Sequence, residues 1–427
     1  MNFTQAIAEL DGRLPGGMLP DLSRIRAVAD MLDHPERTYP SIHITGTNGK
    51  TTTARLVTAL ACGHGVSTGT YTSPHLQSVT ERLSLCGDPI SKDEFAAEYE
   101  RLVPYLREVD GTGERVTYFE ALTALAYLWF SDKPVSLGVF EVGMGGVWDA
   151  TNLITSDVAV LCPIALDHPE LGSTVKEVAT EKAGIIKEGK VAVSREQPDD
   201  VLGVVEERCK EVSAGLLLEG RDFALEDRAP AVGGQLLTVQ GVHETYEDLS
   251  MPLFGEDAAR NAAAAVVALE AFFGKALSPE ATREALARTA SPGRLEVVDR
   301  HPLVVLDGAH NPAAAEALSY ALPEAFAWDR LHLVLAISSN KDIPGIVREL
   351  VRLHGRAYVT RNSTTRSATP DVVLEACREA GMQAEEYASV REALAAARAE
   401  AADKDLILVT GSLYTVADAR EAVLPHA

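Results

Sequence analysis

The stretch SIHITGTNGKTT, residues 41–52, decides the fold. It opens with the β-branched run 41–44, which is typical of a buried strand, and it leads into residues 52–61, whose Ala- and Leu-rich pattern predicts a helix. Between them, Gly46 and Gly49 let backbone N–H groups turn toward an anion, and the helix N-terminus adds a partial positive charge. A strand, a glycine-containing loop and a helix in this order predict a site for nucleotide phosphates.

The polar residues of this loop suit the same chemistry. Lys50 can reach the outer phosphates, and a hydroxyl at Thr51 or Thr52 can meet Mg²⁺. The spacing is shorter than the common G-x-x-x-x-G-K-[ST] form. An ordinary strand-to-helix turn with a solvated lysine is therefore the alternative to a phosphate loop at this point.

Strands and helices alternate along the rest of the chain. Residues 137–142 and 158–163 read as apolar strands, and residues 119–130 read as a helix before them. Such alternation predicts parallel strands joined by crossover helices. The pattern restarts near residue 300, with predicted strands at 303–306, 331–337, 357–360 and 406–410.

The most plausible domain boundary is the turn-rich segment 291–294. We therefore expect one domain over residues 1–292 and a second over residues 293–427. The stretch from about 215 to 250 carries short alternating runs, and we expect a small antiparallel addition to the first domain there.

Composition narrows the class of protein. The 427 residues carry a net charge of -23, which argues against nucleic-acid binding because that function needs a basic face. The five cysteines are widely spaced and include no C-x-x-C pair, so we expect reduced thiols in a cytoplasmic protein, with neither a zinc site nor a disulfide framework. Residues 1–10 do not form a signal peptide, and no apolar stretch approaches the roughly 20 residues of a membrane span.

A series of motifs resembles one known family. TGTNGK at 45–50 is similar to the phosphate loop of the Mur ligase superfamily, and the later motifs resemble folylpolyglutamate synthase/dihydrofolate synthase. Those motifs are SPHL at 73–76, ERL at 81–83, FE at 119–120 with Thr123, EVGMGG at 141–146, DATN at 149–152, LDH at 166–168, LG at 171–172, EKAGIIK at 181–187, GR at 293–294, DGAHNP at 307–312 and VTGS at 409–412. They follow the order of the family.

The resemblance implies both a fold and a reaction. The fold would be α/β, with an N-terminal P-loop-type ATP-binding domain of mostly parallel sheet and a smaller C-terminal Rossmann-like α/β domain. The enzyme would be an ATP-dependent ligase that adds L-glutamate to a pterin- or folate-like acid through an acyl phosphate, and it would be a monomer. Closure of the second domain over the first would complete the site and exclude water.

The resemblance also implies roles for individual residues. Two Mg²⁺ ions would be held with the help of Thr51, Ser73, Glu141 and His168. Lys182 resembles the lysine that is carbamylated in many relatives. A surface acid at a strand end, a loop histidine and a surface lysine are the alternatives for Glu141, His168 and Lys182, and Lys187 is expected to be solvated.

The remaining roles concern the nucleotide and the substrates. Besides Lys50, the implied nucleotide contacts are Thr47, Asn48, Gly49, Thr51, Thr52, Asn261, Arg294 and Asp307. His310 would lie near the transferring groups and act in catalysis with Lys50 and Lys182. The implied substrate contacts are Ser73, His75, Arg82, Phe119 and Ser412. Helix capping is the alternative role for Asp307.

The chain also departs from the family pattern. Thr51-Thr52 stands where folate-type members usually have Gly-Ser, and Val147 stands where they have Arg. The segment 167–172 is one residue shorter and lacks an aromatic residue, and Asp257-Ala258 replaces His-Gln. A folate enzyme remains the main hypothesis. A paralogue that ligates a different acid and a non-catalytic nucleotide-binding regulator are the alternatives.

Overall fold

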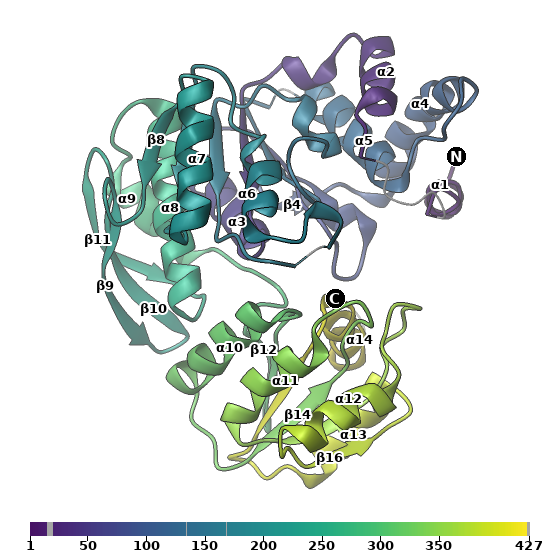
Figure 1. Cartoon of the computed structure of the whole chain (residues 1–427), viewed down its shortest axis with the longest axis vertical. Coiled ribbons are helices and arrows are strands. Elements are labelled where there is room, and N and C mark those ends of the chain that lie inside the picture. Colours follow the sequence, from purple (N-terminus) through teal and green to yellow (C-terminus); the bar gives the residue numbers. More distant parts are fainter. Residues whose placement is uncertain (15–19, 134, 168, 425–427) are drawn as a thin grey trace. The chain divides into compact units, whose positions relative to one another are not determined.

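The computed structural model describes residues 1–14, 20–133, 135–167 and 169–424. The chain divides into two compact units. The first comprises Met1–Arg228, Leu237–Met251 and Arg260–Thr289, and the second comprises Ala229–Leu236, Pro252–Ala259 and Ala290–Ala427. Each unit contains its own sheet with covering helices (Figure 1).

The first unit is built on an eight-stranded sheet of order β4-β3-β2-β5-β1-β6-β7-β8. The strands from β2 to β8 in that order run parallel, and β3 pairs antiparallel with both β2 and β4. The strands are β1 (Ser41–Thr45), β2 (Thr68–Tyr71), β3 (Leu83–Leu85), β4 (Asp88–Pro89), β5 (Leu137–Glu141), β6 (Val158–Leu161), β7 (Val191–Ser194) and β8 (Gly215–Leu218). All residues of β1, β5 and β6 are buried, as expected for parallel strands covered on both faces.

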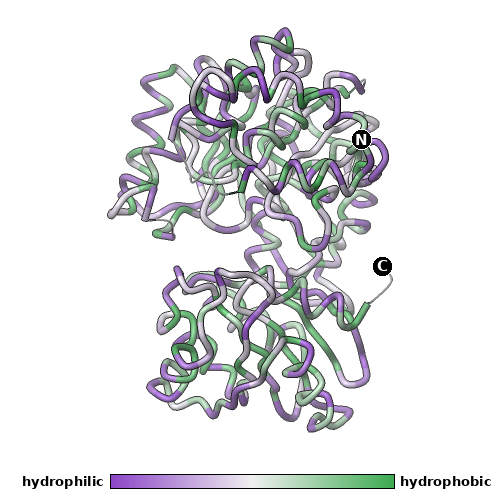
Figure 2. The backbone as a smooth tube through the Cα atoms, turned by 90° about the vertical axis from the view of Figure 1, so that its right-hand side faces the viewer, coloured by the Kyte–Doolittle hydropathy of each residue, from purple (hydrophilic) through white to green (hydrophobic). Residues whose placement is uncertain are grey.

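Helices bury their apolar residues in separate clusters of this unit. One cluster collects residues of α1, α2, α4 and α5, and another collects residues of α6 and α7, which pack side by side (Figure 1). The helices are α1 (Phe3–Asp11), α2 (Ser23–Met31), α3 (Lys50–Gly63), α4 (Lys92–Asp110), α5 (Tyr118–Asp132), α6 (Val175–Ala183), α7 (Asp199–Glu211), α8 (Glu256–Phe273) and α9 (Pro279–Ala287). Figure 2 shows hydrophobic and hydrophilic stretches alternating along the helices and strands of both units.

Between the two main sheets along the chain come β9 (Ala224–Ala231), β10 (Gly234–Gln240) and β11 (Thr245–Met251), which form a three-stranded sheet. A small sheet was predicted over about residues 215–250. For residues 215–218 that prediction was wrong, because β8 pairs parallel with β7 in the main sheet. Short 3₁₀ turns cover Pro35–Arg37, Val79–Arg82, Ala150–Leu153, Pro169–Leu171 and Val351–Leu353.

The second unit has a six-stranded sheet of order β12-β13-β17-β14-β15-β16, in which only the β12–β13 pair is antiparallel among the described strands. Its strands are β12 (Glu296–Arg300), β13 (Leu303–Leu306), β14 (Leu331–Leu335), β15 (Arg356–Val359), β16 (Ala384–Glu386) and β17 (Leu406–Thr410). Its helices are α10 (Pro312–Ala325), α11 (Ile343–Leu350), α12 (Pro370–Glu379), α13 (Val390–Glu400) and α14 (Leu413–Val423). The mixed α/β fold predicted from the sequence is confirmed.

One covalent feature contradicts the sequence analysis. Cys62, in the last turn of α3, forms a disulfide with Cys86, which follows β3, and their Cα atoms are 5.8 Å apart. The expectation of reduced thiols throughout was therefore wrong for this pair. The two residues come together because β2 lies beside α3 and the Cys86 N–H donates to the Thr68 carbonyl at 2.8 Å. Cys162, Cys209 and Cys377 are free and buried.

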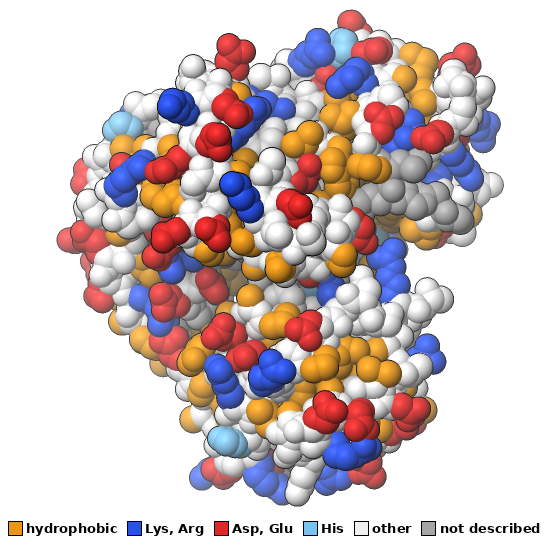
Figure 3. All heavy atoms as spheres, viewed as in Figure 1, with side chains coloured by type: hydrophobic (Ala, Val, Ile, Leu, Met, Phe, Trp, Pro, Cys, Tyr) orange, Lys and Arg blue, Asp and Glu red, His pale blue; other side chains and the backbone are white. Residues whose placement is uncertain are grey.

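Two surface properties bear on the predicted class of protein. Within the described parts of the chain, no helix has both the length and the apolar character that crossing a bilayer requires. On the face shown in Figure 3, acidic side chains are interspersed with basic ones, in keeping with acids scattered along the sequence.

Candidate active site

The loop between β1 and α3 has the geometry of a phosphate site. Gly46 has φ +145°, and a Cβ there would lie 2.6 Å from Cys162 Cβ, so a side chain would collide with the residue that directly follows β6. Gly49 has φ +88° and forms the N-cap of α3. Among the described residues, no side chain caps this helix, so its first-turn N–H groups can serve an anionic ligand.

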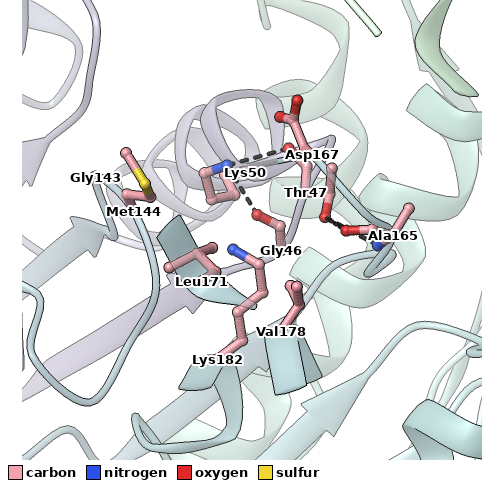
Figure 4. Close-up of a pocket in the computed structure, with 10 residues that line it drawn as sticks. All are labelled: Gly46, Thr47, Lys50, Gly143, Met144, Ala165, Asp167, Leu171, Val178 and Lys182. Atoms are coloured by element: carbon pink, nitrogen blue, oxygen red, sulfur yellow. Dashed lines mark hydrogen bonds between the residues drawn. The ribbon is translucent and has the colours of Figure 1, made fainter. Parts of the chain in front are cut away.

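Lys50 lies across the loop rather than out in solvent. Its Nζ donates to the carbonyl oxygens of Gly46 at 2.8 Å and Thr47 at 3.2 Å (Figure 4). Thr47 Oγ1 donates to the Ala165 carbonyl at 2.8 Å and accepts from the Ala165 N–H at 2.9 Å, which braces the loop against the segment after β6. Lys50 is therefore held by backbone carbonyls of its own loop instead of extending into solvent, and its role at nucleotide phosphates stays a prediction.

Glu141 gathers the residues expected at a metal. It ends β5 beside β1, and its side chain is almost completely buried. Thr51 Oγ1 donates to Glu141 Oε1 at 2.7 Å, and the Ser73 N–H donates to Oε2 at 3.0 Å. Burial raises the pKa of Glu141, and Lys50 is the strongest influence that lowers it. The alternative of a surface acid was wrong.

The donor set around Glu141 fits Mg²⁺. A carboxylate with neighbouring hydroxyl oxygens is what this hard cation prefers, and it commonly uses only one or two carboxylates together with phosphate oxygens and water. In the described residues, no cluster of three or more His, Cys, Asp or Glu offers an all-protein cage for a transition metal. His168, the remaining predicted ligand, lies outside the described residues. Of the two threonine hydroxyls that could meet Mg²⁺, that of Thr51 contacts Glu141, whereas Thr52 is buried in α3.

Lys182 lies in a pocket with the phosphate loop, at the last turn of α6, and its side chain points toward Lys50 (Figure 4). Lys182 is 3% exposed, so the alternative of a surface lysine was wrong. Burial and then the charge of Lys50 lower the pKa of Lys182 to about 7, against smaller raising effects of Asp149, Asp167 and Glu181. The pocket is lined by Gly46, Thr47, Lys50, Gly143, Met144, Ala165, Asp167, Leu171, Val178 and Lys182.

The glycine-rich segment after β5 is held against the end of α6. Glu181 Oε1 accepts from the N–H groups of Gly146 and Trp148, each at 3.2 Å. A Cβ at Gly146 would lie 2.4 Å from the Glu181 carbonyl oxygen, so the two backbones approach too closely for another residue. The valine that replaces the family arginine, Val147, is 48% exposed.

The segment after β2 carries three of the predicted substrate residues, Ser73, His75 and Arg82, and the fourth, Phe119, lies on α5. Arg82 Nε donates to His75 Nδ1 at 2.9 Å, and the Arg82 guanidinium lies 5.6 Å from the centroid of the Tyr118 ring. Burial, followed by the charge of Arg82, lowers the pKa of His75 to about 4, which leaves the ring neutral at pH 7. Phe119 packs its ring directly against Gly143. Ser73 joins this loop to Glu141.

Asn261 lies beside the phosphate loop, and it has a partner that sequence reasoning missed. The carboxamide of Asn261 packs on Gly49, and Arg195 Nη1 donates to Asn261 Oδ1. Arg195 is fully buried and also pairs with Glu219 at 2.9 Å. The signal available in the sequence was a charged pair, Arg195-Glu196, directly after the apolar run that forms β7.

The predicted residues of the second unit lie around the end of β13. Asp307 accepts from the N–H groups of Leu295 at 3.0 Å and Ala309 at 2.9 Å. The helix-capping alternative for Asp307 was wrong, because Asn311 caps α10. Arg294 Nη1 lies against Gly308, and His310 Nδ1 lies 2.9 Å from the Gly308 carbonyl oxygen.

Two further expectations involve residues away from these clusters. Ser412 Oγ accepts from the Tyr414 N–H at 3.2 Å and caps α14, so the structure gives it a local role at a helix start. Lys187 was expected to be solvated, which was wrong. Its Nζ donates to Asn152 Oδ1 at 2.8 Å, and burial lowers the pKa of Lys187 to about 8.

Comparison with known proteins identifies the family. The pattern described as the Mur ligase middle domain matches residues 44–269, and that of the Mur ligase glutamate ligase domain matches residues 293–413. The dihydrofolate synthase/folylpolyglutamate synthase of Mycobacterium tuberculosis (strain ATCC 25618 / H37Rv) is 39% identical over 446 residues, covering 96% of this chain and 92% of the relative. The chain belongs to the dihydrofolate synthase/folylpolyglutamate synthase family of Mur ligases. The resemblance drawn from the motifs is confirmed.

Solved structures of the family agree with this assignment. Mycobacterium tuberculosis folylpolyglutamate synthase complexed with ADP matches with a TM-score of 0.95 and 39% identity, over 99% of this chain and 98% of that one. A complex of folylpolyglutamate synthase with AMPPCP and folate matches with a TM-score of 0.88 and 30% identity, over 99% and 100% of the two chains. The chain is thus an ATP-dependent ligase of this family.

Proposed function

We propose that this ligase joins the amine of L-glutamate to the carboxylate of a pteroate or folate. ATP would first phosphorylate that carboxylate, giving an acyl phosphate and ADP. The glutamate amine would then attack the acyl carbon, an amide would form, and phosphate would leave. The observation that carries the proposal is the convergence of Lys50, Lys182, Thr51 and Glu141 on one loop at the end of β1.

The residues of this loop have separable tasks in the reaction. The N–H groups of the first turn of α3 would bind phosphate oxygens, and Lys50 would leave its carbonyl partners to pair with the transferring phosphoryl group. Thr51, Ser73 and Glu141, together with His168, would hold Mg²⁺ at two sites. The metal would neutralise phosphoryl charge when bound. Asn48 and Thr47 would contact the phosphates through the same loop.

We also propose that Lys182 is carbamylated. A carbamate forms when a neutral amine attacks carbon dioxide and loses a proton, so it requires an amine that is deprotonated near neutral pH. The pKa of Lys182, lowered to about 7 by burial and by Lys50, meets that requirement. The product is an anion directed at the pocket that Lys50 shares, where it would offset the positive charge of Lys50. Intact-mass analysis with and without bicarbonate measures the modification.

The acid substrate is assigned from the loop that carries His75 and Arg82. The Tyr118 and Phe119 rings offer flat apolar surfaces to an aromatic pterin, while neutral His75 and cationic Arg82 offer polar contacts. A family complex with folate supports the same class of acid. Because Val147 replaces the cation usual in folate-type members, a paralogue with a different acid is the second candidate. The monomeric state and cytoplasmic location expected from the sequence remain predictions.

The test is phosphate release with ATP, Mg²⁺ and L-glutamate, with dihydropteroate, a reduced folate or a non-pterin carboxylic acid added in turn. Release that depends on a pterin acid and on glutamate is expected. Release only with another acid would replace the folate assignment by the paralogue. ATP binding without turnover of any acid would indicate a non-catalytic nucleotide-binding regulator. The control is the Lys50→Ala variant, which we expect to keep the fold and to lose its contact with the phosphates.

A further inference from the structure

Behind the phosphate loop lies a buried polar network that the reaction scheme does not use. Arg195 follows β7, and its side chain is 1% exposed. Its Nε donates to Glu219 Oε2 at 2.9 Å, and its Nη1 donates to Asn261 Oδ1. A buried guanidinium is costly unless its donors are satisfied, so its retention beside the nucleotide loop requires an explanation.

The carboxylate of Glu219, the anion of this network, accepts hydrogen bonds from several donors. Arg260 Nε donates to Glu219 Oε1 at 2.7 Å, and the Glu196 N–H donates to Glu219 Oε2 at 2.8 Å. Burial alone would raise the pKa of Glu219, but Arg260 and Arg195 outweigh burial and lower it. Glu219 is therefore a carboxylate near neutral pH, and it anchors the Arg195 guanidinium at one orientation.

The anchored guanidinium in turn fixes the carboxamide of Asn261. A guanidinium carries only donors, so it can bind the carbonyl oxygen of Asn261 and not the amide nitrogen. This bond selects one of the two flip states of the side chain, with Nδ2 turned away from Arg195. The same carboxamide covers Gly49, because a Cβ at that position would lie 2.9 Å from Nδ2 and 3.1 Å from Oδ1.

Gly49 is the position at which the phosphate loop becomes a helix. It has φ +88°, and its carbonyl oxygen accepts the Thr53 N–H at 2.9 Å. A residue that restricts Gly49 from behind therefore restricts the direction of the N–H groups in the first turn of α3. The contacts form one continuous line from Glu219 through Arg195 and Asn261 to Gly49.

We propose that Arg195 is a positioning residue for nucleotide binding. By locking the carboxamide of Asn261 against Gly49, it holds the loop in the conformation that receives the nucleotide phosphates. The inference rests on the proposed function only in taking this loop as the nucleotide site, and it is independent of the identity of the acid. Arg195 does not touch the reacting atoms, so its removal affects nucleotide affinity more than the chemical step.

The experiment compares Arg195→Met with Arg260→Met as the matched control. Both variants remove one arginine from Glu219, but only the first removes the partner of Asn261. ADP binding is measured by calorimetry without any acid substrate, and kcat and KM for ATP are measured with the acid that supports turnover. We expect Arg195→Met to weaken ADP binding about tenfold more than Arg260→Met does, with KM for ATP rising in parallel and kcat changing less than about threefold.

A double-mutant cycle shows whether the effect passes through Asn261. If it does, Arg195→Met adds little to ADP affinity once Asn261→Ala is present. Equal losses in Arg195→Met and Arg260→Met, or additive losses in the cycle, would overturn the inference. Should Arg195→Met fail to fold, Arg195→Lys replaces it, since lysine keeps the charge but lacks the planar fork through which Nε and Nη1 bind Glu219 and Asn261 at the same time. Unchanged ADP affinity in that variant also overturns the inference. Absence of ADP binding by the wild type would refute the proposed function instead.

Discussion

Lys182→Met should flatten the dependence of stability on pH. Lys182 is 3% exposed, and burial followed by the charge of Lys50 lowers its pKa to about 7. In the unfolded chain an ordinary lysine keeps its proton to about pH 10.4. Between these two values the unfolded state binds the proton and the folded state does not, so the free energy of unfolding rises with pH across this window. Below about pH 7 both states are protonated, and the full cost of burying the charge is present.

The size of the effect follows from the two pKa values. A tenfold change in an acid dissociation constant corresponds to about 1.4 kcal/mol, so complete relief of the buried charge is worth about 5 kcal/mol. Within an accessible range, from about pH 6 to about pH 9, linkage gives a gain of about 2.5 kcal/mol. Methionine is similar in length, fits an apolar pocket and does not titrate, so the Lys182→Met variant lacks this gain.

The assay is urea unfolding at both pH values in buffers free of carbon dioxide, which keeps the lysine unmodified. For each protein, the free energy of unfolding at the lower pH is subtracted from that at the higher pH. This difference is then compared between the wild type and the variant. Lys176→Met is the control, since Lys176 is exposed on the same helix and the variant makes the same substitution outside the pocket. Identical pH profiles for wild type and Lys182→Met would refute the argument that Lys182 is buried as a readily deprotonated amine.

Further variants test the loop, the metal ligand and the disulfide. Lys50→Ala should abolish turnover and leave the circular dichroism spectrum unchanged. Near-normal activity in this variant would refute the assignment of the loop as a phosphate site. Glu141→Gln should raise the Mg²⁺ concentration for half-maximal activity at least about tenfold, since even loss of a residue that supports a metal ligand costs that much; an unchanged titration would make Glu141 structural. Replacing Cys62 and Cys86 by Ser opens a loop closed over a separation of 24 residues, which corresponds to about 3 kcal/mol of stability. A dithiol reductant should lower the stability of the wild type to that of the variant. Equal stability of the wild type and the variant without reductant would argue against the disulfide.

Strands with continuous apolar runs were the part of the fold that the sequence predicted best. The predicted bounds of β13 and β17 agree with the structure, because LVVL and LILVT are apolar almost throughout and lie between two neighbouring strands of the sheet. β8 was placed in the wrong sheet. Its sequence GLLL does not distinguish an edge position beside β7 from a place in the small sheet, since that choice depends on long-range pairing.

Site residues that belong to a sequence motif could be predicted. Properties that depend on burial in the folded chain could not. The meeting of Thr51, Ser73 and Glu141 follows from strand ends at one edge of a parallel sheet, and the structure brings these residues together. The sequence did not reveal that Lys182 is buried, because its neighbour Glu181 gives the local pattern of an exposed helix face. The disulfide was also missed, since Cys62 and Cys86 become neighbours only through the packing of α3 beside β2.

The sequence gives only a weak local signal for the Arg195 network, the charged pair Arg195-Glu196 directly after the apolar run of β7. Arg195, Glu219 and Asn261 come from three separate parts of the first unit, and of the three only Asn261 was singled out from the sequence, as an implied nucleotide contact. Their burial is a property of the assembled sheet and α8. Sequence reasoning from one chain therefore finds the residues that face the ligand more readily than those that hold them in place.

In the proposed reaction, ATP phosphorylates the carboxylate of a pterin acid before that acid is joined to glutamate. The direct measurement uses dihydropteroate whose carboxylate carries a heavy-oxygen label, with ATP, Mg²⁺, L-glutamate and the wild-type enzyme, and analyses both products by mass spectrometry. We expect a product extended by one glutamate, with one labelled oxygen transferred to inorganic phosphate. A glutamylated product accompanied by unlabelled phosphate, or no glutamylated product from any pterin acid, would contradict it.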